Sequence, residues 1–302
     1  MIFTIAIPTY NNAKTIREAV KSSVNQDFPL PYEVLVVNNN CTDHTQDILD
    51  EFGDKIRVVK NPETVSVVQN HNICLQHAKG DYIIYCHSDD KMMDDALSKF
   101  HGILKKRAFP KKYVLWGRTM YRDYFENWKN SDVQLDHIAS GIDALKAFLG
   151  GGLAPSGTCY DRKSFTEVGG FIETDHPLAP MDMVVMWKLV FSHFEFEMAG
   201  NIFYIREYAS TAVVIDHSDW IAKATVAIGR FIDQCSEGEI KLFKEVIRRN
   251  QRINYDVYIA LQNNMLISKS KLLNLYFRQL FLNPAKIFSL YRWKVLFKIL
   301  KN

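Results

Sequence analysis

The sequence predicts an α/β protein with a Rossmann-like, doubly wound and mostly parallel sheet, followed by a helical extension at the carboxyl end. Short apolar, β-prone runs alternate with longer segments that carry apolar residues at four-residue spacing, as strands and helices do. The run at residues 83–86 is apolar at every position rather than at every second one, which is typical of a strand buried on both faces. After residue 220 only the helical pattern continues.

The elements follow one another closely from the start of the chain. Strands are predicted at residues 3–7, 32–37, 56–59, 82–86 and 113–116, and helices at 13–26, 45–52, 66–78 and 96–106. Pro8 is expected to end the first strand. Because right-handed crossovers bring the carboxyl ends of parallel strands to one edge, we expect the loops at Pro8, Asn38 and His87 to lie together.

Composition and cysteine usage exclude several classes of protein. The 302 residues are 47% hydrophobic and 24% charged, which is ordinary for a globular protein. The five cysteines are scattered without a CxxC pair, so we expect neither a disulfide framework nor a zinc site. No uncharged apolar run is long enough to span a bilayer, and the first residues are strand-like rather than a leader. We therefore expect a cytoplasmic protein.

Charge is distributed unevenly along the chain. Residues 269–302 carry eight basic and no acidic side chains, and subtracting these from the net charge of +3 leaves −5 for the rest. We expect no nucleic-acid partner for the body. The tail interleaves aromatic and aliphatic residues with cations, and Pro284 divides it into two basic amphipathic helices that would lie on the inner face of the cytoplasmic membrane. The alternatives are a hairpin packed on the domain or a dimer contact.

Two adjacent carboxylates follow the fourth strand. Asp89 and Asp90 stand where open α/β sheets bind ligands, and hard oxygen donors suit Mg²⁺ or Mn²⁺ carrying a diphosphate. The alternative is that they only cap the helix beginning near Asp94, because Asp is a preferred N-cap residue.

Five ordered blocks carry a resemblance to a known family. They occupy residues 5–11, 22–26, 33–43, 69–81 and 87–90, and include Pro8-Thr9-Tyr10-Asn11 and His87-Ser88-Asp89-Asp90. The set resembles the amino-terminal signature of family 2 glycosyltransferases of the GT-A fold, over about the first 210 residues, whereas neither GxGxxG nor GxxxxGK[ST] is present. The resemblance implies an inverting enzyme that takes a sugar from a nucleotide diphosphate. It divides the chain into a catalytic domain at 1–219, with a nucleotide-sugar half at 1–110 and an acceptor half at 111–219, and a helical region at 220–302.

The same resemblance implies a set of nucleotide-sugar-binding residues. They are Pro8, Tyr10, Asn11, Asn38, Asn39, Asn70, His87 and Ser88. The family's usual pair at 38 and 39 is Asp-Asp, so an amide here replaces a carboxylate acceptor and leaves the base open. The alternative for Asn38 to Asn40 is a turn that tolerates left-handed backbone. Asp43 is expected to cap the next helix.

The resemblance also implies a metal ligand, Asp89. The family pattern is Asp-x-Asp-Asp, and His87 stands at its first position, where it could hydrogen-bond ribose or ligate the metal as neutral imidazole. The alternative is a site that has lost its metal or its activity.

Asp182 is the predicted general base. Residues 180–188 resemble the family's Glu-Asp block with Met181 in place of Glu, and inversion requires a carboxylate to take the acceptor proton. Met181 and Met183 are expected to desolvate Asp182 and raise its pKa, the alternative being a helix N-cap.

The resemblance implies three further features of the site. Arg206 is expected to bind the diphosphate, Tyr208 replaces a His that is frequent in the family, and residues 150–158 would meet the acceptor.

The predicted function is therefore an inverting glycosyltransferase in the synthesis of a cell-surface polysaccharide or lipopolysaccharide. Its partners would be a nucleotide-sugar donor, Mg²⁺ or Mn²⁺, a glycan or lipid-linked acceptor and the membrane surface. The alternative is a non-catalytic glycan- or nucleotide-binding protein on a degenerate GT-A fold, which the departures at 38, 39, 87 and 181 would suit. Asp89 and Asp182 together argue against it.

Overall fold

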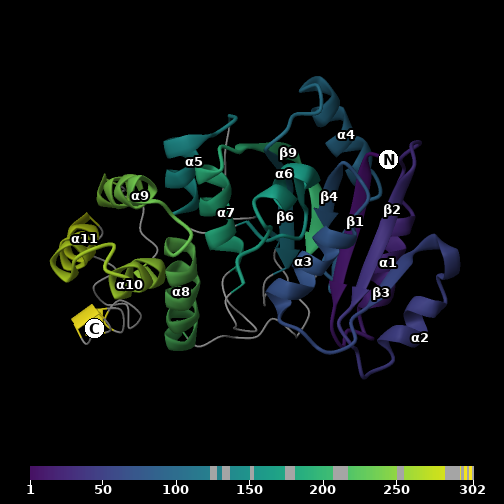
Figure 1. Cartoon of the computed structure of the whole chain (residues 1–302), viewed down its shortest axis with the longest axis horizontal. Coiled ribbons are helices and arrows are strands. Elements are labelled where there is room, and N and C mark those ends of the chain that lie inside the picture. Colours follow the sequence, from purple (N-terminus) through teal and green to yellow (C-terminus); the bar gives the residue numbers. More distant parts are fainter. Residues whose placement is uncertain are drawn as a thin grey trace.

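A mixed central sheet with helices on both faces forms the larger part of the computed structural model (Figure 1). The structure describes residues 1–122, 128–130, 137–149, 153–173, 181–206, 217–249, 255–282, 293, 296–297 and 299–300. Within these residues the strands of the sheet follow the order β3-β2-β1-β4-β8-β6-β9-β5, and β7 pairs with β6. Their bounds are β1 Phe3–Thr9, β2 Tyr32–Asn38, β3 Arg57–Lys60, β4 Tyr82–Tyr85, β5 Asp90–Met92, β6 Tyr113–Arg122, β7 Trp128–Asn130, β8 Thr158–Asp161 and β9 Glu195–Arg206.

The amino-terminal half is the doubly wound, parallel arrangement that the sequence predicts. β3, β2, β1 and β4 are parallel neighbours, joined by α1 Ile16–Val24, α2 Thr45–Asp50 and α3 Val67–His77. Along β1, Ile5 and Ile7 belong to the apolar cluster that contains Ile16 of α1, whereas Ala6 belongs to the cluster that contains Val68 of α3. Successive side chains of a strand point to opposite faces, so α1 and α3 cover opposite faces.

β1 runs two residues further than expected, through Pro8 to Thr9. Proline lacks an N–H and should interrupt a central strand. The Ala6 carbonyl accepts from the Cys86 N–H, so the backbone groups of Ala6 are directed toward β4. The backbone of Pro8, two residues later, is directed to the same side, but β4 has already ended there. The opposite side of the strand stays paired, because the Thr9 carbonyl accepts from the Asn39 N–H. No ladder bond is lost at Pro8, so the prediction that it ends the strand is wrong.

Beyond β4 the sheet becomes mixed. β8 is antiparallel to both β4 and β6, β6 is parallel to β9, and the short β5 is antiparallel to β9. α4 Ala96–Lys106, α5 Gly141–Phe148, α6 Arg162–Glu167 and α7 Met181–Phe191 pack around this half. The predicted bounds of α4 are confirmed, and Ser66 caps α3 by accepting from the Gln69 N–H.

The carboxyl-terminal region is helical, as predicted. α8 His217–Ile232, α9 Glu237–Arg249, α10 Tyr255–Asn263 and α11 Lys269–Leu282 gather at the left of Figure 1, at the end of the molecule away from β2 and α1. Trp187 of α7 packs against two of these helices, because its ring lies 4.9 Å from that of Phe243 in α9 and 5.7 Å from that of Phe231 in α8. No helix in the described part of the chain is long and apolar enough to cross a membrane.

Candidate nucleotide and metal site

Three loops meet at the carboxyl edge of the parallel strands, as predicted from the chain order. The backbone N–H of Asn12, after β1, donates to the Thr45 hydroxyl over 3.0 Å, and the Asn12 side chain donates to the Ser88 hydroxyl over 2.5 Å. The Thr42 N–H, after β2, donates to the Asn11 side-chain oxygen over 2.8 Å. The loops after β1, β2 and β4 therefore form one connected rim.

Tyr10 and Asn11, in the loop after β1, are exposed at this rim. The Tyr10 side chain is 49% exposed. Asn11 has a left-handed backbone with φ of 51°, which Asn tolerates better than most residues, and its N–H donates to the Cys41 sulfur over 3.2 Å. Pro8 is buried inside β1. Of the predicted residues in the first loop, Tyr10 and Asn11 are thus the ones that a ligand could reach.

The predicted residues at the end of β2 are buried and hydrogen-bonded within the protein. The Asn38 amide donates to Gln46 over 2.6 Å and its oxygen accepts from the Cys41 N–H over 2.8 Å. The Asn39 oxygen accepts from Asn61 and from the Val65 N–H, both at 2.9 Å.

Asn70, also predicted to bind the nucleotide sugar, belongs to the same network of amides. Its side-chain oxygen accepts from Asn61 over 3.0 Å, and the residue is 4% exposed. The network around Asn39, Asn61 and Asn70 is uncharged, and its hydrogen bonds hold the buried residues beneath the three loops in one arrangement.

Asp43 stabilises the loop after β2. Its carboxylate accepts from the N–H of Thr45, the first residue of α2, and from the Ala13 N–H, each at 3.0 Å. Burial pushes the pKa of Asp43 upward, but the hydrogen bonds from Thr45 and Ala13 outweigh it and lower the pKa. His44 occupies the N-cap position of α2, so Asp43 bonds the start of the helix from one residue before the position that was expected to cap it.

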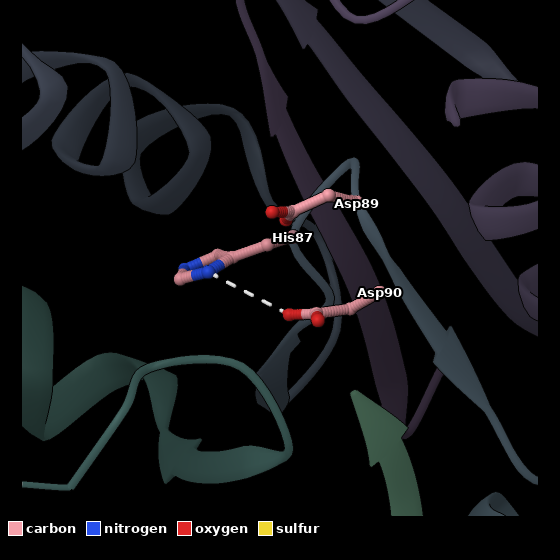
Figure 2. Close-up of side chains that lie close together, drawn as sticks. All are labelled: His87, Asp89 and Asp90. Atoms are coloured by element: carbon pink, nitrogen blue, oxygen red, sulfur yellow. Dashed lines mark ion pairs between the residues drawn. The ribbon is translucent and has the colours of Figure 1, made fainter. Parts of the chain in front are cut away.

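His87, Asp89 and Asp90 bring three potential metal ligands together. One ligand atom of each lies within 4.8 Å of the others, and His87 Nδ1 is 3.7 Å from Asp90 Oδ2. Figure 2 shows the imidazole and both carboxylates projecting to the same side of the ribbon. Asp90 is 2% exposed, whereas His87 and Asp89 are half-buried and open toward the rim. The Ser156 hydroxyl accepts from the His87 N–H over 2.8 Å, which places the predicted acceptor loop beside the cluster.

The alternative that Asp89 and Asp90 cap the following helix is wrong. α4 begins at Ala96, preceded by Asp95, and β5 lies between the carboxylates and the helix. Asp90 is the first residue of β5 and pairs with Arg206 of β9. The Asp90 N–H donates to the His87 carbonyl over 3.0 Å, and this turn brings the two residues together before β5 begins. Arg206, the predicted diphosphate ligand, therefore has its backbone beside the cluster.

The buried His71 ring contacts the His87 ring through one nitrogen of each. His71 Nε2 lies 3.0 Å from His87 Nε2, and its Nδ1 lies 2.8 Å from the Val67 carbonyl oxygen. Burial lowers the pKa of His71 to about 4, while the hydrogen bond to Val67 works in the opposite direction, so the ring is neutral near pH 7. His71 lies within one of the resembling blocks, but no feature of the sequence alone pairs it with His87.

Asp182 is half-buried in the first turn of α7, between the buried Met181 and Met183. Burial is the main cause that raises the pKa of Tyr160, a hydrogen bond with Thr158 works in the opposite direction, and the charge of Asp182 adds a smaller upward effect. The Tyr160 ring contacts Phe171, and the Phe171 ring contacts His71. These aromatic rings connect the buried side of the metal-ligand cluster to Tyr160 of β8.

Several predicted features lie outside the described residues. They are Tyr208, residues 150–152 of the predicted acceptor loop, and residues 174–180 before α7. Two residues of the site, Asn12 and His71, were not among those predicted from the sequence, and both act through side-chain contacts. Asp90 was predicted beside Asp89 as an oxygen donor, although the family resemblance alone implied only Asp89 as the ligand.

Comparison with known proteins adds a family match. The model of the family described as "Glycosyl transferase family 2" matches residues 4–169, more than half of the chain. Among curated relatives, poly(ribitol-phosphate) beta-N-acetylglucosaminyltransferase TarS of Staphylococcus aureus is 35% identical over 101 residues, which cover 32% of this chain. The matched part is 18% of the length of TarS.

Solved structures share the fold over almost the whole chain. The structure of S. aureus TarS 1–349 in complex with UDP-GlcNAc aligns with a TM-score of 0.67 and 16% identity, covering 90% of this chain and 83% of that one. Mannosyltransferase PcManGT from Pyrobaculum calidifontis, in complex with GDP-Man and Mn²⁺, aligns with a TM-score of 0.60 and 17% identity, covering 99% of this chain and 86% of that one. At these identities the likeness is one of fold.

Proposed function

Since the chain belongs to glycosyltransferase family 2, we propose that it is an inverting glycosyltransferase that moves one sugar from a nucleoside-diphosphate donor to an acceptor hydroxyl. The observation that carries this proposal is the rim of three loops beside His87, Asp89 and Asp90. In open α/β sheets, ligands bind at this edge. Tyr10 and Asn11 would contact the base and ribose. The buried amides of Asn38, Asn39 and Asn70 would hold the loops around the nucleotide in place.

The donor set fits a divalent cation. A neutral imidazole and two carboxylates suit Mn²⁺, and the carboxylates alone suit Mg²⁺. Such a cation would neutralise the negative charge that builds up on the diphosphate as it leaves. Asp89 and His87 would hold it from the open side and Asp90 from the buried side. Arg206 would approach the same diphosphate from β9.

Asp182 would act as the general base. A half-buried carboxylate in the first turn of α7 can accept the proton of the acceptor hydroxyl as that oxygen attacks the sugar. Residues 153–158, which pass beside His87 through Ser156, would line the acceptor side.

The acceptor would be a growing surface polysaccharide, free or attached to a lipid. Support comes from the relative named for transfer to poly(ribitol-phosphate). A bacterial cell-surface polymer pathway, lipopolysaccharide included, is the setting we propose, with the protein cytoplasmic and peripheral at the membrane.

The carboxyl-terminal helices would supply the membrane contact. Phe277, Trp293, Phe297 and Leu300 are between 51% and 70% exposed, and α11 begins with Lys269 and Lys271. Exposed aromatic side chains beside cations are typical of interfacial helices, at about 1 kcal/mol per cation near an anionic surface. The protein should sediment with phosphatidylglycerol vesicles and not with phosphatidylcholine vesicles. Equal recovery from both would contradict this contact.

A thermal shift measurement tests the donor site. The full chain is heated with UDP, GDP, CDP or dTDP, each with and without Mn²⁺. A ligand at a hundred times its Kd stabilises the folded state by about 2.7 kcal/mol, so one nucleotide should raise Tm by several degrees. The shift should shrink in Tyr10→Ala and persist in Asp54→Asn, whose side chain lies on the exposed turn Gly53–Lys55. No shift with any nucleotide, for a folded protein, would contradict the proposal.

A further inference from the structure

Two imidazole rings, those of His71 and His87, meet through one nitrogen of each. His71 Nε2 and His87 Nε2 lie 3.0 Å apart, and the two ring planes are at 89°. In a hydrogen bond between two imidazoles, one nitrogen carries the hydrogen and the other offers its lone pair. Which nitrogen donates is decided by what the remaining nitrogens contact.

The second nitrogen of His71 settles the direction. Nδ1 lies 2.8 Å from the backbone carbonyl oxygen of Val67, and a carbonyl oxygen can only accept. His71 therefore carries its hydrogen on Nδ1 and offers the lone pair of Nε2. His87 Nε2 must then be the donor in the bond between the two rings.

His87 consequently faces the carboxylates with its other nitrogen. With the hydrogen on Nε2, the lone pair of a neutral His87 is on Nδ1, which lies 3.7 Å from Asp90 Oδ2 (Figure 2). A lone pair and two carboxylates that converge in this way repel one another unless a metal cation, or a proton on Nδ1, lies between them. Metal-ligating histidines usually donate their other N–H to a neighbouring acceptor, which fixes the ring and its tautomer.

The surroundings of His71 are built to keep that ring in place. It stacks on Tyr85 with ring centres 5.3 Å apart, and the Phe171 ring meets it edge-on at 5.5 Å. The Tyr85 hydroxyl donates to the His71 carbonyl over 3.0 Å. Asn72 holds Phe171 by bonding both its N–H and its carbonyl at 2.9 Å. His71 has little freedom to rotate or to exchange its hydrogen-bond partners.

We propose that His71 is a positioning residue that locks His87 in the tautomer whose Nδ1 binds the cation, and that the resulting nitrogen and carboxylate site prefers Mn²⁺ to Mg²⁺. Mg²⁺ takes oxygen ligands almost exclusively, whereas first-row transition ions bind imidazole readily. The inference rests on the cation of the proposed function and is independent of the transfer reaction itself.

Binding of Mn²⁺ alone to the chelator-treated full chain tests this assignment. Electron paramagnetic resonance gives the Mn²⁺ affinity, competition with Mg²⁺ gives the preference, and pulsed measurements detect a directly bonded ¹⁴N nucleus. The wild type should show the ¹⁴N coupling, and His87→Asn should lose it. His71→Phe, which offers no acceptor, should weaken Mn²⁺ binding about 10- to 100-fold and reduce the preference over Mg²⁺.

Two further variants separate positioning from a merely structural effect. His71→Gln keeps an amide oxygen that can accept from His87, so it should retain more Mn²⁺ affinity than His71→Phe and serves if the latter does not fold. His101→Asn removes an imidazole that packs on Phe28 and Phe109, away from the cluster, and should change nothing.

Each contrary result overturns a distinct statement. Bound Mn²⁺ without ¹⁴N coupling would overturn the ligand role of His87 and leave both metal binding and transfer standing. Unchanged Mn²⁺ affinity in folded His71→Phe and His71→Gln would overturn the positioning role. If the wild type bound no Mn²⁺, this inference and the proposed cation would both fail, while a nucleotide-dependent thermal shift would still support the transferase.

Discussion

The Asn12 side-chain amide donates a 2.5 Å hydrogen bond to the hydroxyl of Ser88. This contact joins the loop after the first strand to the loop that carries the metal-ligand cluster. Ser88 is 3% exposed and stands between His87 and Asp89, so the position of Asn12 is transmitted to both potential ligands. A shift of the loop after β1, on the nucleotide side, would therefore also move the loop that carries the metal-ligand cluster.

Asn12→Ala should weaken nucleotide binding about fivefold without altering the fold. A neutral hydrogen bond contributes about 1 kcal/mol, and here its loss loosens the rim rather than a direct ligand contact. Isothermal titration with the nucleotide that gives the thermal shift measures the change. Asn12→Ala and Ser88→Ala together should cost less than the sum of the two, because both remove the same bond. Strict additivity would contradict this coupling.

The parallel half of the fold and its functional edge could be predicted because local signals determine them. β1, β2 and β4 are rich in apolar residues, each is followed by a polar loop, and right-handed crossovers leave one edge at which these loops can meet. The family resemblance at residues 5–11 and 87–90 then predicted which chemistry belongs at that edge, and the match to residues 4–169 confirms the family.

The mixed half and the inner contacts of the site could not be predicted in the same way. β5 is three residues long, and its pairing with β9 joins positions more than a hundred residues apart. Likewise, the contacts of Asn12 with Ser88 and of His71 with His87 depend on side-chain directions that no periodicity encodes. Asn38 and Asn39 were placed correctly at the end of β2, but their burial in a network of amides follows from Gln46, Asn61 and Val65.

Gly170→Ala should destabilise the protein by about 2 kcal/mol. Gly170 has a φ of +62°, a left-handed backbone that costs an L-residue about 1–2 kcal/mol, and a Cβ there would also collide with the Asn72 side chain that holds Phe171. Urea unfolding measures the loss. The matched control is Gly102→Ala in α4, where a Cβ meets nothing within 4 Å and better helix propensity should add about 0.5–1 kcal/mol. Equal effects from the two substitutions would contradict this account.

Glu33→Gln should lower stability at neutral pH and not at low pH. Burial pushes the pKa of Glu33 upward, but hydrogen bonds from Thr4, Arg57 and the Lys79 N–H outweigh it and lower the pKa. A lowered pKa means that the carboxylate stabilises the fold above its unfolded pKa, about 4.3, and that this contribution is lost as pH falls through the folded pKa.

Urea unfolding at pH 7 should therefore show a loss of about 2 kcal/mol for Glu33→Gln, since hydrogen bonds to a charged group contribute about 1.5–3 kcal/mol each and the amide keeps some of them. The difference from wild type should shrink steadily below about pH 4. Glu51→Gln is the control, because its partner Arg17 is 46% exposed and water screens such a surface pair. A difference that is constant with pH would show that packing, not charge, underlies the effect.

Asp182→Asn should abolish most of the transfer while leaving nucleotide binding intact. The amide has nearly the same shape but cannot accept the acceptor proton, and loss of a general base typically lowers kcat by about 10²- to 10⁴-fold. Single-turnover transfer of a radiolabelled sugar measures the rate, and the thermal shift with the cognate nucleotide measures binding.

The pairing of these two measurements distinguishes catalysis from mere recognition. Asp143→Asn, on the exposed first turn of α5, should leave both unchanged. If Asp182→Asn transferred sugar at the wild-type rate, another carboxylate would have to be the base. If the wild type bound the nucleotide but transferred no sugar to any polysaccharide or lipid-linked acceptor, the non-catalytic binding protein would be the better description, because Asp182 would then have no proton to accept.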